Sequence, residues 1–416
     1  MSAPHLFEGY GLELEYMIVD RRTLDAKPIA DRALARMAGT RTREVEHGRL
    51  GWSNELALHV IELKTLGPVS SLSGLAGPFQ EEIRTLNALL ADFNACLLPT
   101  AMHPWMKPQE AVLWPHGDHE IYEAYNRIFD CRGHGWVNLQ STHLNLAFHG
   151  DDEFRRLHSA LRLLLPILPS LAASSPVVEG KSTGRLDTRL HHYRRNQRLI
   201  PSIAGEVIPE TISTRAQYEE KILQRIYRDI APHDPQHLLQ YEWLNSRGAI
   251  ARFDRSAVEI RLLDVQECPL ADVAIAVLVV ESLKTITAET WQPLAEQMQL
   301  PEKRLAEILS RTSTAGDEAV IDDPLYLQCF GIARPVTAGR IWQVLFGKVE
   351  NDLKKGPADI EQALDHILQR GTLAGRIIKT LEEKTDGPRL RAVYKELADC
   401  LQKGGLYDTD VLNGRF

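Results

Sequence analysis

The stretch YGLELEYMIV at residues 10–19 alternates charged and apolar side chains after a glycine. This period-two alternation predicts a β-strand, because successive side chains of a strand point to opposite faces. Glu13 and Glu15 then share one face and lie about 7 Å apart. Two carboxylates held so close are unfavourable unless a cation lies between or beside them, and oxygen ligands suit Mg²⁺ or Mn²⁺. In isolation, such a pair is more typical of a solvated strand face.

Two further segments alternate in the same way: WVNLQSTHLNLAF at residues 136–148 and AVEIRLLD at residues 257–264. Both are predicted strands, each with one polar pair on a single face. The pairs are His143 with Asn145, and Glu259 with Arg261. One histidine among carboxylates is compatible with Mg²⁺ or Mn²⁺, and a guanidinium beside a metal ligand can hold phosphate oxygens. The structural alternatives are a hydrogen-bonded core histidine and a surface ion pair.

The segment NELALHVIELKT at residues 54–65 adds the carboxylates Glu55 and Glu62. Residues seven apart share one face of a helix, together with His59, but lie on opposite faces of a regular strand. A strand here therefore needs a bulge or a bend between the two glutamates. The apolar residues fit both structures, so the sequence leaves helix and bent strand open.

Basic residues cluster in GKSTGRLDTR at residues 180–189 and in NSRGAIAR at residues 245–252, as a phosphate-binding site requires. The candidates are Lys181, Arg185, Arg189, Arg247 and Arg252. The first segment is not a Walker-A loop. That motif needs a further glycine five positions before the glycine that precedes the lysine, and this chain has none there. Arginines close to several carboxylates also fit a structural ion-pair network.

Composition limits the classes of protein open to this chain. Its 416 residues carry a net charge of −8, which argues against nucleic acid as the main partner. Five widely spaced cysteines without a CxxC pair are typical of a reducing compartment, and the N-terminus lacks a secretory signal pattern. Proline or aspartate interrupts the most apolar stretches, so no membrane span is predicted. We expect a cytoplasmic protein that binds neither nucleic acid nor membrane.

The order of the predicted elements indicates an α+β fold with a helical C-terminal part. Helices are predicted over residues 69–98, 121–128, 151–173 and 215–230. Beyond Asp272 almost all of the apolar periodicity is helical. We expect one unit over residues 1–290 and a helical extension, packed on it, over residues 291–416.

Six motifs in this order resemble the second glutamate–cysteine ligase family, the bacterial and plant-like carboxylate–amine ligases with a glutamine-synthetase-like fold. They are GLELE (11–15), NELALHVIEL (54–63), HP (103–104), THLNL (142–146), LAASSP with the following GKSTGRLDTR (171–176 and 180–189) and VEIRLLD (258–264). The resemblance covers residues 8–290. It implies a curved, mostly antiparallel sheet with helices on its back and a concave face that holds ATP and divalent metals.

The resemblance also implies roles for individual residues and favours the bent strand at residues 54–65. The implied metal ligands are Glu15, Glu55 and Glu62 on one ion, and Glu13, His143 and Glu259 on another. The implied catalytic arginine is Arg261, which contacts the transferring phosphoryl group, with help from Arg252 and Arg247. Arg189 matches an arginine of the family's glycine-rich loop, where it would hold phosphate or a substrate carboxylate. Lys181, Arg185 and Asn145 are further nucleotide-binding candidates from the residue pattern. The sequence departs from the family at His59 and over residues 129–140 and 245–256, on the substrate side.

Together, these expectations describe a ligase that uses ATP and Mg²⁺ (or Mn²⁺) to join a small amino-acid-like carboxylate to an amine through an acyl-phosphate. The leading hypothesis is a glutamate–cysteine ligase-like reaction that forms a γ-glutamyl amide. Three alternatives stay open: a ligase of the same mechanism for a peptide or another amine, a phosphotransferase, and a non-catalytic binding or regulatory protein with this fold. Relatives are often dimers, so the resemblance also implies a homodimer.

Overall fold

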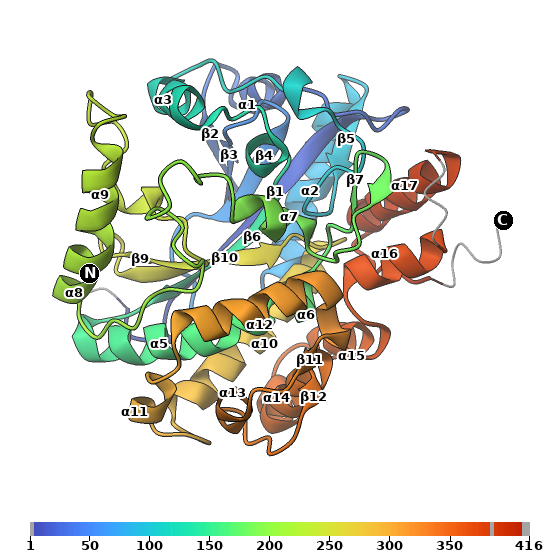
Figure 1. Ribbon diagram of the computed structural model, residues 1–416. Coiled ribbons are helices and arrows are strands. Elements are labelled where there is room, and N and C mark those ends of the chain that lie inside the picture. The colour runs from blue at the N-terminus through green and yellow to red at the C-terminus, as the bar shows by residue number, and fades with distance from the viewer. Residues whose placement is uncertain (1–3, 118, 383–386, 410–416) are drawn as a thin grey trace.

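The computed structural model describes residues 4–117, 119–382 and 387–409, and an eight-stranded antiparallel sheet lies at its centre. The strand order is β2-β3-β4-β1-β6-β10-β9, and β5 pairs with one end of β1. The strands are β1 Tyr10–Asp20, β2 Glu44–His47, β3 Leu50–Asn54, β4 Val60–Thr65, β5 Ala95–Leu98, β6 Ser141–Ala147, β9 Ala249–Arg252 and β10 Ala257–Asp264. Figure 1 shows β1, β6 and β10 side by side in the middle of the molecule. The strands predicted over residues 10–19 and 257–264 are confirmed.

Two pairs of two-residue strands and the helices complete the fold. The short strands are β7 Val177–Val178 with β8 Lys181–Ser182, and β11 Val320–Ile321 with β12 Val336–Thr337. The first ten helices are α1 Ala30–Ala38, α2 Ala76–Ala91, α3 His119–Phe129, α4 His134–Val137, α5 Gly150–Leu164, α6 Pro169–Ala172, α7 Thr188–Tyr193, α8 Arg215–Tyr218, α9 Gln224–Ile230 and α10 Pro269–Thr287. The helices predicted at residues 121–128, 151–173 and 215–230 are therefore confirmed.

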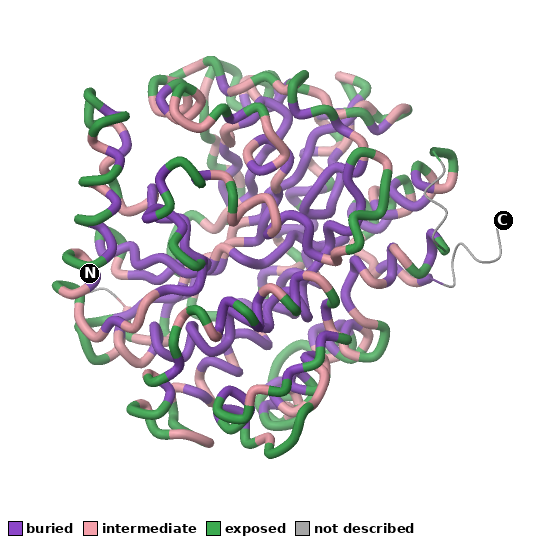
Figure 2. Tube along the Cα trace, viewed as in Figure 1, coloured by how far each residue is buried: buried purple, intermediate pink, exposed green. Residues whose placement is uncertain are grey.

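Alternation along β1 separates the two faces of the sheet. The apolar side chains Leu12, Leu14 and Tyr16 are completely buried in the main core, whereas the glutamates between them point to the opposite face. Helix α10 is apolar on nearly all sides, as a helix inside a core must be, and it contacts α2, α5, α14 and α15. The buried layer formed in this way runs through the centre of the molecule in Figure 2.

The C-terminal part is helical, as predicted. Its helices are α11 Leu294–Gln297, α12 Glu302–Ala315, α13 Pro324–Gln328, α14 Ala338–Leu353, α15 Ala358–Arg370, α16 Leu373–Leu381 and α17 Gly387–Lys403. Helices α14 and α15 join the main core through α10, whereas α17 packs on β5 and α2. No helix within the described residues is both long and apolar enough to cross a bilayer. The division of the chain at residue 290 stays a prediction.

Three local predictions are wrong in part. The helix predicted over residues 69–98 is shorter, because Ala95–Leu98 forms the antiparallel strand β5 against β1. The strand predicted from residue 136 begins only at Ser141, after the short helix α4. Residues 54–65 form neither a helix nor one bent strand: β3 and β4 are separate strands joined by a loop over residues 55–59.

The loop between β3 and β4 is held by a distant part of the chain. Leu58 N donates to the carbonyl of Val112 at 2.8 Å, and Trp114 N donates to the carbonyl of Leu56 at 2.9 Å. These backbone partners lie more than fifty positions away in the sequence. A local hydrophobic pattern cannot encode such bonds, which is why both local interpretations of this segment fail.

Candidate active site

Strand register brings the predicted ligand side chains together on the open face of the sheet. Glu13 lies opposite His143, and Glu15 lies opposite Glu62. Farther along, Asn145 of β6 lies opposite Glu259 of β10. Because directly opposed residues of an antiparallel pair point to the same face, these polar side chains form one contiguous group.

Hydrogen bonds fix the orientation of the two carboxylates of β1. Glu13 accepts a bond of 3.1 Å from Asn145 Nδ2, and its other oxygen lies 3.1 Å from His143 Nδ1. Glu15 accepts bonds from the backbone N–H of Ser141 at 2.7 Å and from its hydroxyl at 3.0 Å. Each of these carboxylates therefore keeps lone pairs available for a cation.

Within the described residues, the cluster contains two groups of three candidate ligand residues, and within each group the ligand atoms lie within 4.8 Å of one another. One group is Glu15, Glu55 and Glu62, which is the set implied for one ion; the other is Glu13, Glu62 and His143. Glu62 thus belongs to both groups. Glu259 lies beside them, with its Oε1 3.9 Å from His143 Nδ1.

The acidic cluster is electrostatically strained in the absence of a cation. Burial, together with the charges of Glu15 and Glu62, raises the pKa of Glu55 well above its ordinary value. Burial and the charge of Glu13 raise the pKa of Glu62 to about 7. Burial opposes the charged form of His143, but its bond to Glu13 and the other carboxylates raise its pKa to about 9. Oxygen donors with a single imidazole fit a hard divalent ion such as Mg²⁺ or Mn²⁺.

Glu259 positions an arginine at the edge of the cluster. Arg261 Nε donates to Glu259 Oε1 at 2.6 Å, and Arg252 approaches the other oxygen at 3.4 Å. Burial opposes ionisation of Glu259, but Arg261 and His143 outweigh it and lower its pKa to about 2. The register of β10 against β6 shifts between Ile260 and Leu263, so Arg261 lies in a β-bulge. This irregularity leaves the Arg261 side chain to line the cavity above the sheet.

Helix α7 carries Arg189 to the same place. The N-cap residue Asp187 accepts a hydrogen bond from Leu190 N at 2.7 Å, which fixes the start of the helix. Arg189 is buried, bonds to the carboxylate of Asp264 and donates to the carbonyl of Arg261 at 3.3 Å. It lines the cavity with Arg261. The structure therefore brings these two predicted arginines together.

Other predicted basic residues lie elsewhere. Arg247 forms a two-pronged ion pair with both oxygens of Glu210 at 2.6 Å and donates to the carbonyl of Ser202, bonds typical of a structural arginine. Lys181 is exposed on β8, and Arg185 donates to the hydroxyl of Thr314 at 2.7 Å. None of the bonds of these three side chains within the described residues goes to the acidic cluster, and their catalytic or nucleotide-binding roles stay predictions.

Aromatic side chains form a wall that the sequence analysis missed. A cavity of about 210 Å³ opens over Glu15, Glu55 and Arg261. Its aromatic lining is Tyr122 and Tyr125 of α3, Trp136 of α4, Tyr193 of α7 and Trp243 of the 3₁₀ helix η4 (Glu242–Leu244). The Tyr125 ring centroid lies 5.3 Å from that of Trp136 and 6.0 Å from that of Trp243. Trp243 in turn stacks on the exposed Tyr241.

The wall has a partial signal in the sequence. Its tryptophans fall at or close to the stretches that depart from the family pattern, residues 129–140 and 245–256. The segments that carry them lie far apart along the chain and meet only over the sheet. Helix α3 sits at the top of the molecule in Figure 1, above the strands that carry the glutamates. The tryptophan content of these segments, and not their periodicity, indicates a binding surface.

The sequence was compared with known families and proteins. It matches the glutamate-cysteine ligase family 2 model over residues 10–394. An uncharacterized protein of Archaeoglobus fulgidus is 38% identical over 397 residues, which cover 95% of this chain and 99% of that protein. A putative glutamate–cysteine ligase 2-1 of Rubrobacter xylanophilus is 26% identical over 192 residues, 44% of this chain and 46% of that protein.

Two solved structures have a similar fold. A glutamate–cysteine ligase from Francisella tularensis, in complex with AMP, matches with a TM-score of 0.52 and 14% identity over 98% of this chain and 97% of that chain. A bifunctional glutathione synthetase from Pasteurella multocida matches with a TM-score of 0.61 and 14% identity, over 96% of this chain but 53% of that chain. At this identity, the two structures support the fold alone. The match of the family model over nearly the whole chain, together with the polar strand faces described above, shows that this protein belongs to glutamate–cysteine ligase family 2.

Proposed function

We propose that the protein is an ATP-dependent ligase that joins a carboxylate to an amine through an acyl-phosphate. The observation that carries the proposal is the acidic cluster beside Arg261. Three carboxylates within 4.8 Å of one another, two of them with a raised pKa, are a costly arrangement that a divalent cation relieves. Family membership and the fold support a ligase, and the cluster supports the dependence on a metal and a nucleotide.

Each residue of the cluster has a definite task in this proposal. Divalent ions held by Glu13, Glu15, Glu55, Glu62 and His143, when bound, would neutralise the β- and γ-phosphates of ATP during phosphoryl transfer. The chain itself supplies a fixed guanidinium beside them. Glu259 holds Arg261 at 2.6 Å, so its remaining N–H groups are preorganised to bind the oxygens of the transferring group.

Arg189 would bind the carboxylate substrate, and the aromatic wall would protect the acyl-phosphate. The ion pair with Asp264 fixes the orientation of the Arg189 guanidinium beside Arg261. A carboxylate substrate in the cavity would accept further hydrogen bonds from Arg189. The wall of Tyr125, Trp136 and Trp243 would limit the access of water once substrates fill the cavity. Exclusion of water matters here because hydrolysis of an acyl-phosphate would waste ATP without forming an amide.

The aromatic wall favours an amine other than cysteine. Glutamate–cysteine ligation is the reaction named by the family, and we propose a γ-glutamyl-type amide as the leading product. Five aromatic side chains among the described residues line the cavity, however, and the small side chain of cysteine makes little use of such a surface. A larger amino acid or the end of a peptide would bury that aromatic surface, which supports the alternative of the same mechanism with another amine.

The five widely spaced cysteines, without a CxxC pair, support the proposal of a cytoplasmic location.

The test measures ADP release with Mg²⁺ and ATP over a panel of amino acids and short peptides, offered singly and in pairs. Products are identified by mass. ADP formed only with a carboxylate and an amine together, and a product of their summed mass less water, supports the proposal. A phosphorylated single substrate would instead identify a phosphotransferase. A protein that binds neither Mg²⁺ nor ATP would contradict any catalytic role of the cluster.

A further inference from the structure

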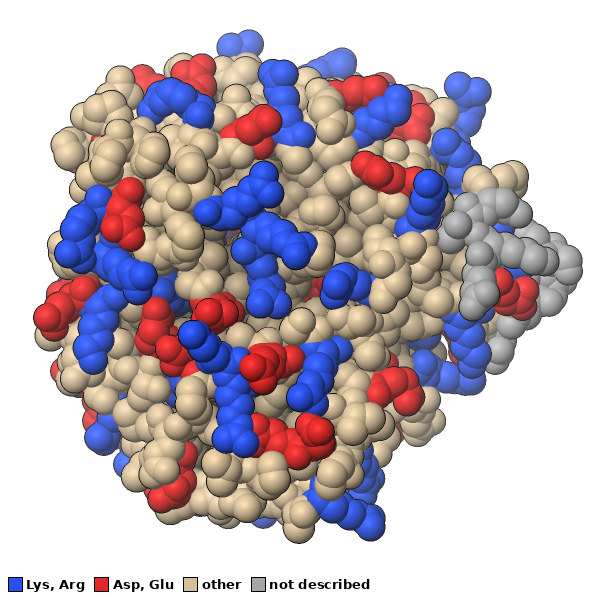
Figure 3. All heavy atoms as spheres, viewed as in Figure 1, with Lys and Arg blue, Asp and Glu red and all other residues tan. Residues whose placement is uncertain are grey.

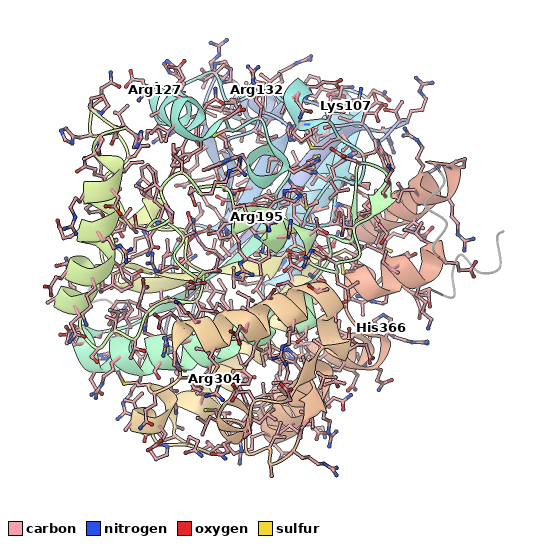
Figure 4. All side chains as sticks on the ribbon, in the orientation of Figure 1. Lys107, Arg127, Arg132, Arg195, Arg304 and His366 are labelled. Carbon is pink, nitrogen blue, oxygen red and sulfur yellow. The ribbon has the colours of Figure 1, made fainter. Side chains whose placement is uncertain are left out.

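A second polar cavity lies on the far side of helix α7. Its volume is about 390 Å³, and it opens between α7 and the last turns of α12. The lining residues are Arg185, His191, Arg194, Arg195, Ser310 and Ser313. Among the described residues, this lining includes no acidic and no apolar side chain. Figure 3 shows Lys and Arg side chains gathered near the centre of this face, and Figure 4 places Arg195 there.

Helix α7 separates the two cavities by its periodicity. Arg189 and Tyr193 are four residues apart and line the active-site cavity. His191, two residues after Arg189, lines the second cavity together with Arg194 and Arg195 of the turn that follows the helix. Residues two apart point to nearly opposite sides of a helix, so α7 stands between the two cavities. The second cavity is therefore separate from the acidic cluster.

The arginines of the second cavity lack acidic partners. Within the described residues, none of Arg185, Arg194 and Arg195 forms an ion pair with a carboxylate; Arg185 bonds to the Thr314 hydroxyl, and Arg195 contacts His191. Arg194 is half-buried. Burial and the two neighbouring arginines lower its pKa, against the opposing charge of Glu206. Like charges held this close to one another are unfavourable without an anion.

A purely structural role does not account for the cluster. Cations are often found at helix C-termini, where they pair with free carbonyl groups. At the end of α12, however, the carbonyls of Ser313 and Thr314 already accept bonds from the backbone N–H groups of Asp187 and Leu186, at 2.9 Å and 3.2 Å. Arg194 and Arg195 are therefore not needed to cap this helix.

We propose that the cavity between α7 and α12 binds a phosphate-type oxyanion outside the active site. Guanidinium forks match tetrahedral oxyanions, and the hydroxyl of Ser310 adds a neutral donor. Within the part of the chain that the structure describes, the lining includes no Phe, Tyr, Trp or aliphatic side chain, which favours inorganic phosphate or the phosphate group of a compact metabolite as the ligand. The ligand would lie directly behind the helix that carries Arg189 and Tyr193 into the active site.

The test is titration calorimetry of the full chain with inorganic phosphate, without divalent metal and at constant ionic strength. The double variant Arg194→Gln/Arg195→Gln removes two charges from the cavity. The matched control, Arg132→Gln/Arg198→Gln, removes two exposed charges that lie outside its lining. Arg261→Gln changes the active site alone. Thermal unfolding of each variant shows that it is folded.

We expect saturable binding by the wild type, by the control and by Arg261→Gln, with an affinity at least about tenfold weaker in the cavity variant. Glycerol phosphate is titrated in parallel to distinguish free phosphate from a phosphate group carried by a metabolite. If glycerol phosphate competes with inorganic phosphate, the cavity accepts both; if it does not, the ligand is free phosphate. The proposal is overturned if the wild type shows no saturable binding at millimolar phosphate. Unchanged affinity in the cavity variant, or loss of binding in Arg261→Gln, also overturns it.

Discussion

The substitution Glu62→Gln separates the role of the acidic cluster in stability from its role in metal binding. The glutamine keeps the volume of the side chain and can still accept the 2.7 Å hydrogen bond that Ser53 Oγ donates to Glu62. The change removes one buried negative charge from both groups of candidate ligand atoms. We therefore expect the metal-free protein to become more stable and the binding of Mg²⁺ to become weaker.

The pKa of Glu62 sets the size of the first effect. Folding raises this pKa from 4.5 to about 7, mainly through burial, so the folded state holds a proton that the unfolded state has released. The contribution of Glu62 to the stability of the metal-free wild type therefore falls as pH rises above 4.5, and the loss is complete above pH 7. At about 1.36 kcal/mol per pKa unit, the loss is about 3 kcal/mol at pH 8. For a chain of this length, that corresponds to about 3 °C in Tm.

The assay is thermal unfolding at pH 5 and pH 8, with EDTA or with Mg²⁺. Glu62→Gln should melt about 3 °C above the wild type at pH 8 with EDTA, and the difference should shrink at pH 5. Its Mg²⁺ affinity should be at least about tenfold weaker. Glu44→Gln is the control, because Glu44 also contacts Lys64 but is not a candidate ligand. A less stable Glu62→Gln variant with wild-type Mg²⁺ affinity would refute the reasoning.

Three further predictions concern the cavity and the core. Arg261→Gln should lower kcat about 10²- to 10³-fold while ATP still binds, as equilibrium titration with a nucleotide can measure; a near-normal kcat would remove Arg261 from the mechanism. Trp243→Ala should raise KM for the amine about tenfold or more and leave KM for ATP unchanged, and the opposite pattern would identify the wall as an adenine site. Burial and two arginines lower the pKa of His158 to about 3, so the unfolded state alone takes up a proton below pH 6.5, and the contribution of this side chain to stability falls by about 2 kcal/mol between pH 7 and pH 5, opposite in sign to that of Glu62. Denaturant titrations should show that His158→Leu loses this contribution, so that its stability at pH 5 relative to pH 7 exceeds that of the wild type, whereas the control His233→Leu keeps the wild-type difference; equal differences in both variants would contradict the assignment.

The part of the site that lies on strands was predictable because strand faces repeat every two residues. Alternation along β1 and β10 separates Glu13, Glu15 and Glu259 from the apolar residues without any knowledge of the fold. The same rule placed His143 and Asn145 on one face of β6. Polar residues on these faces are informative because a buried strand has little reason to carry them.

Features that depend on distant partners could not be predicted. The loop that carries Glu55 takes its shape from bonds to Val112 and Trp114, and the aromatic wall forms only when three separate segments meet over the sheet. Arg247 also depends on a distant partner. It forms an ion pair with Glu210, 37 positions earlier, and the catalytic role expected for it beside Arg252 stays a prediction. Local pattern fixes which face a side chain occupies, and tertiary contacts decide its partner.

The most direct test of the proposed chemistry follows oxygen from the carboxylate substrate. The pair of substrates that releases most ADP is used with both carboxylate oxygens of the acyl donor labelled with ¹⁸O, and the released phosphate is analysed by mass. If the carboxylate attacks the γ-phosphorus and the amine then displaces phosphate, each phosphate carries one ¹⁸O from the acyl donor. Unlabelled phosphate, or label in AMP instead, would contradict an acyl-phosphate and with it the central claim.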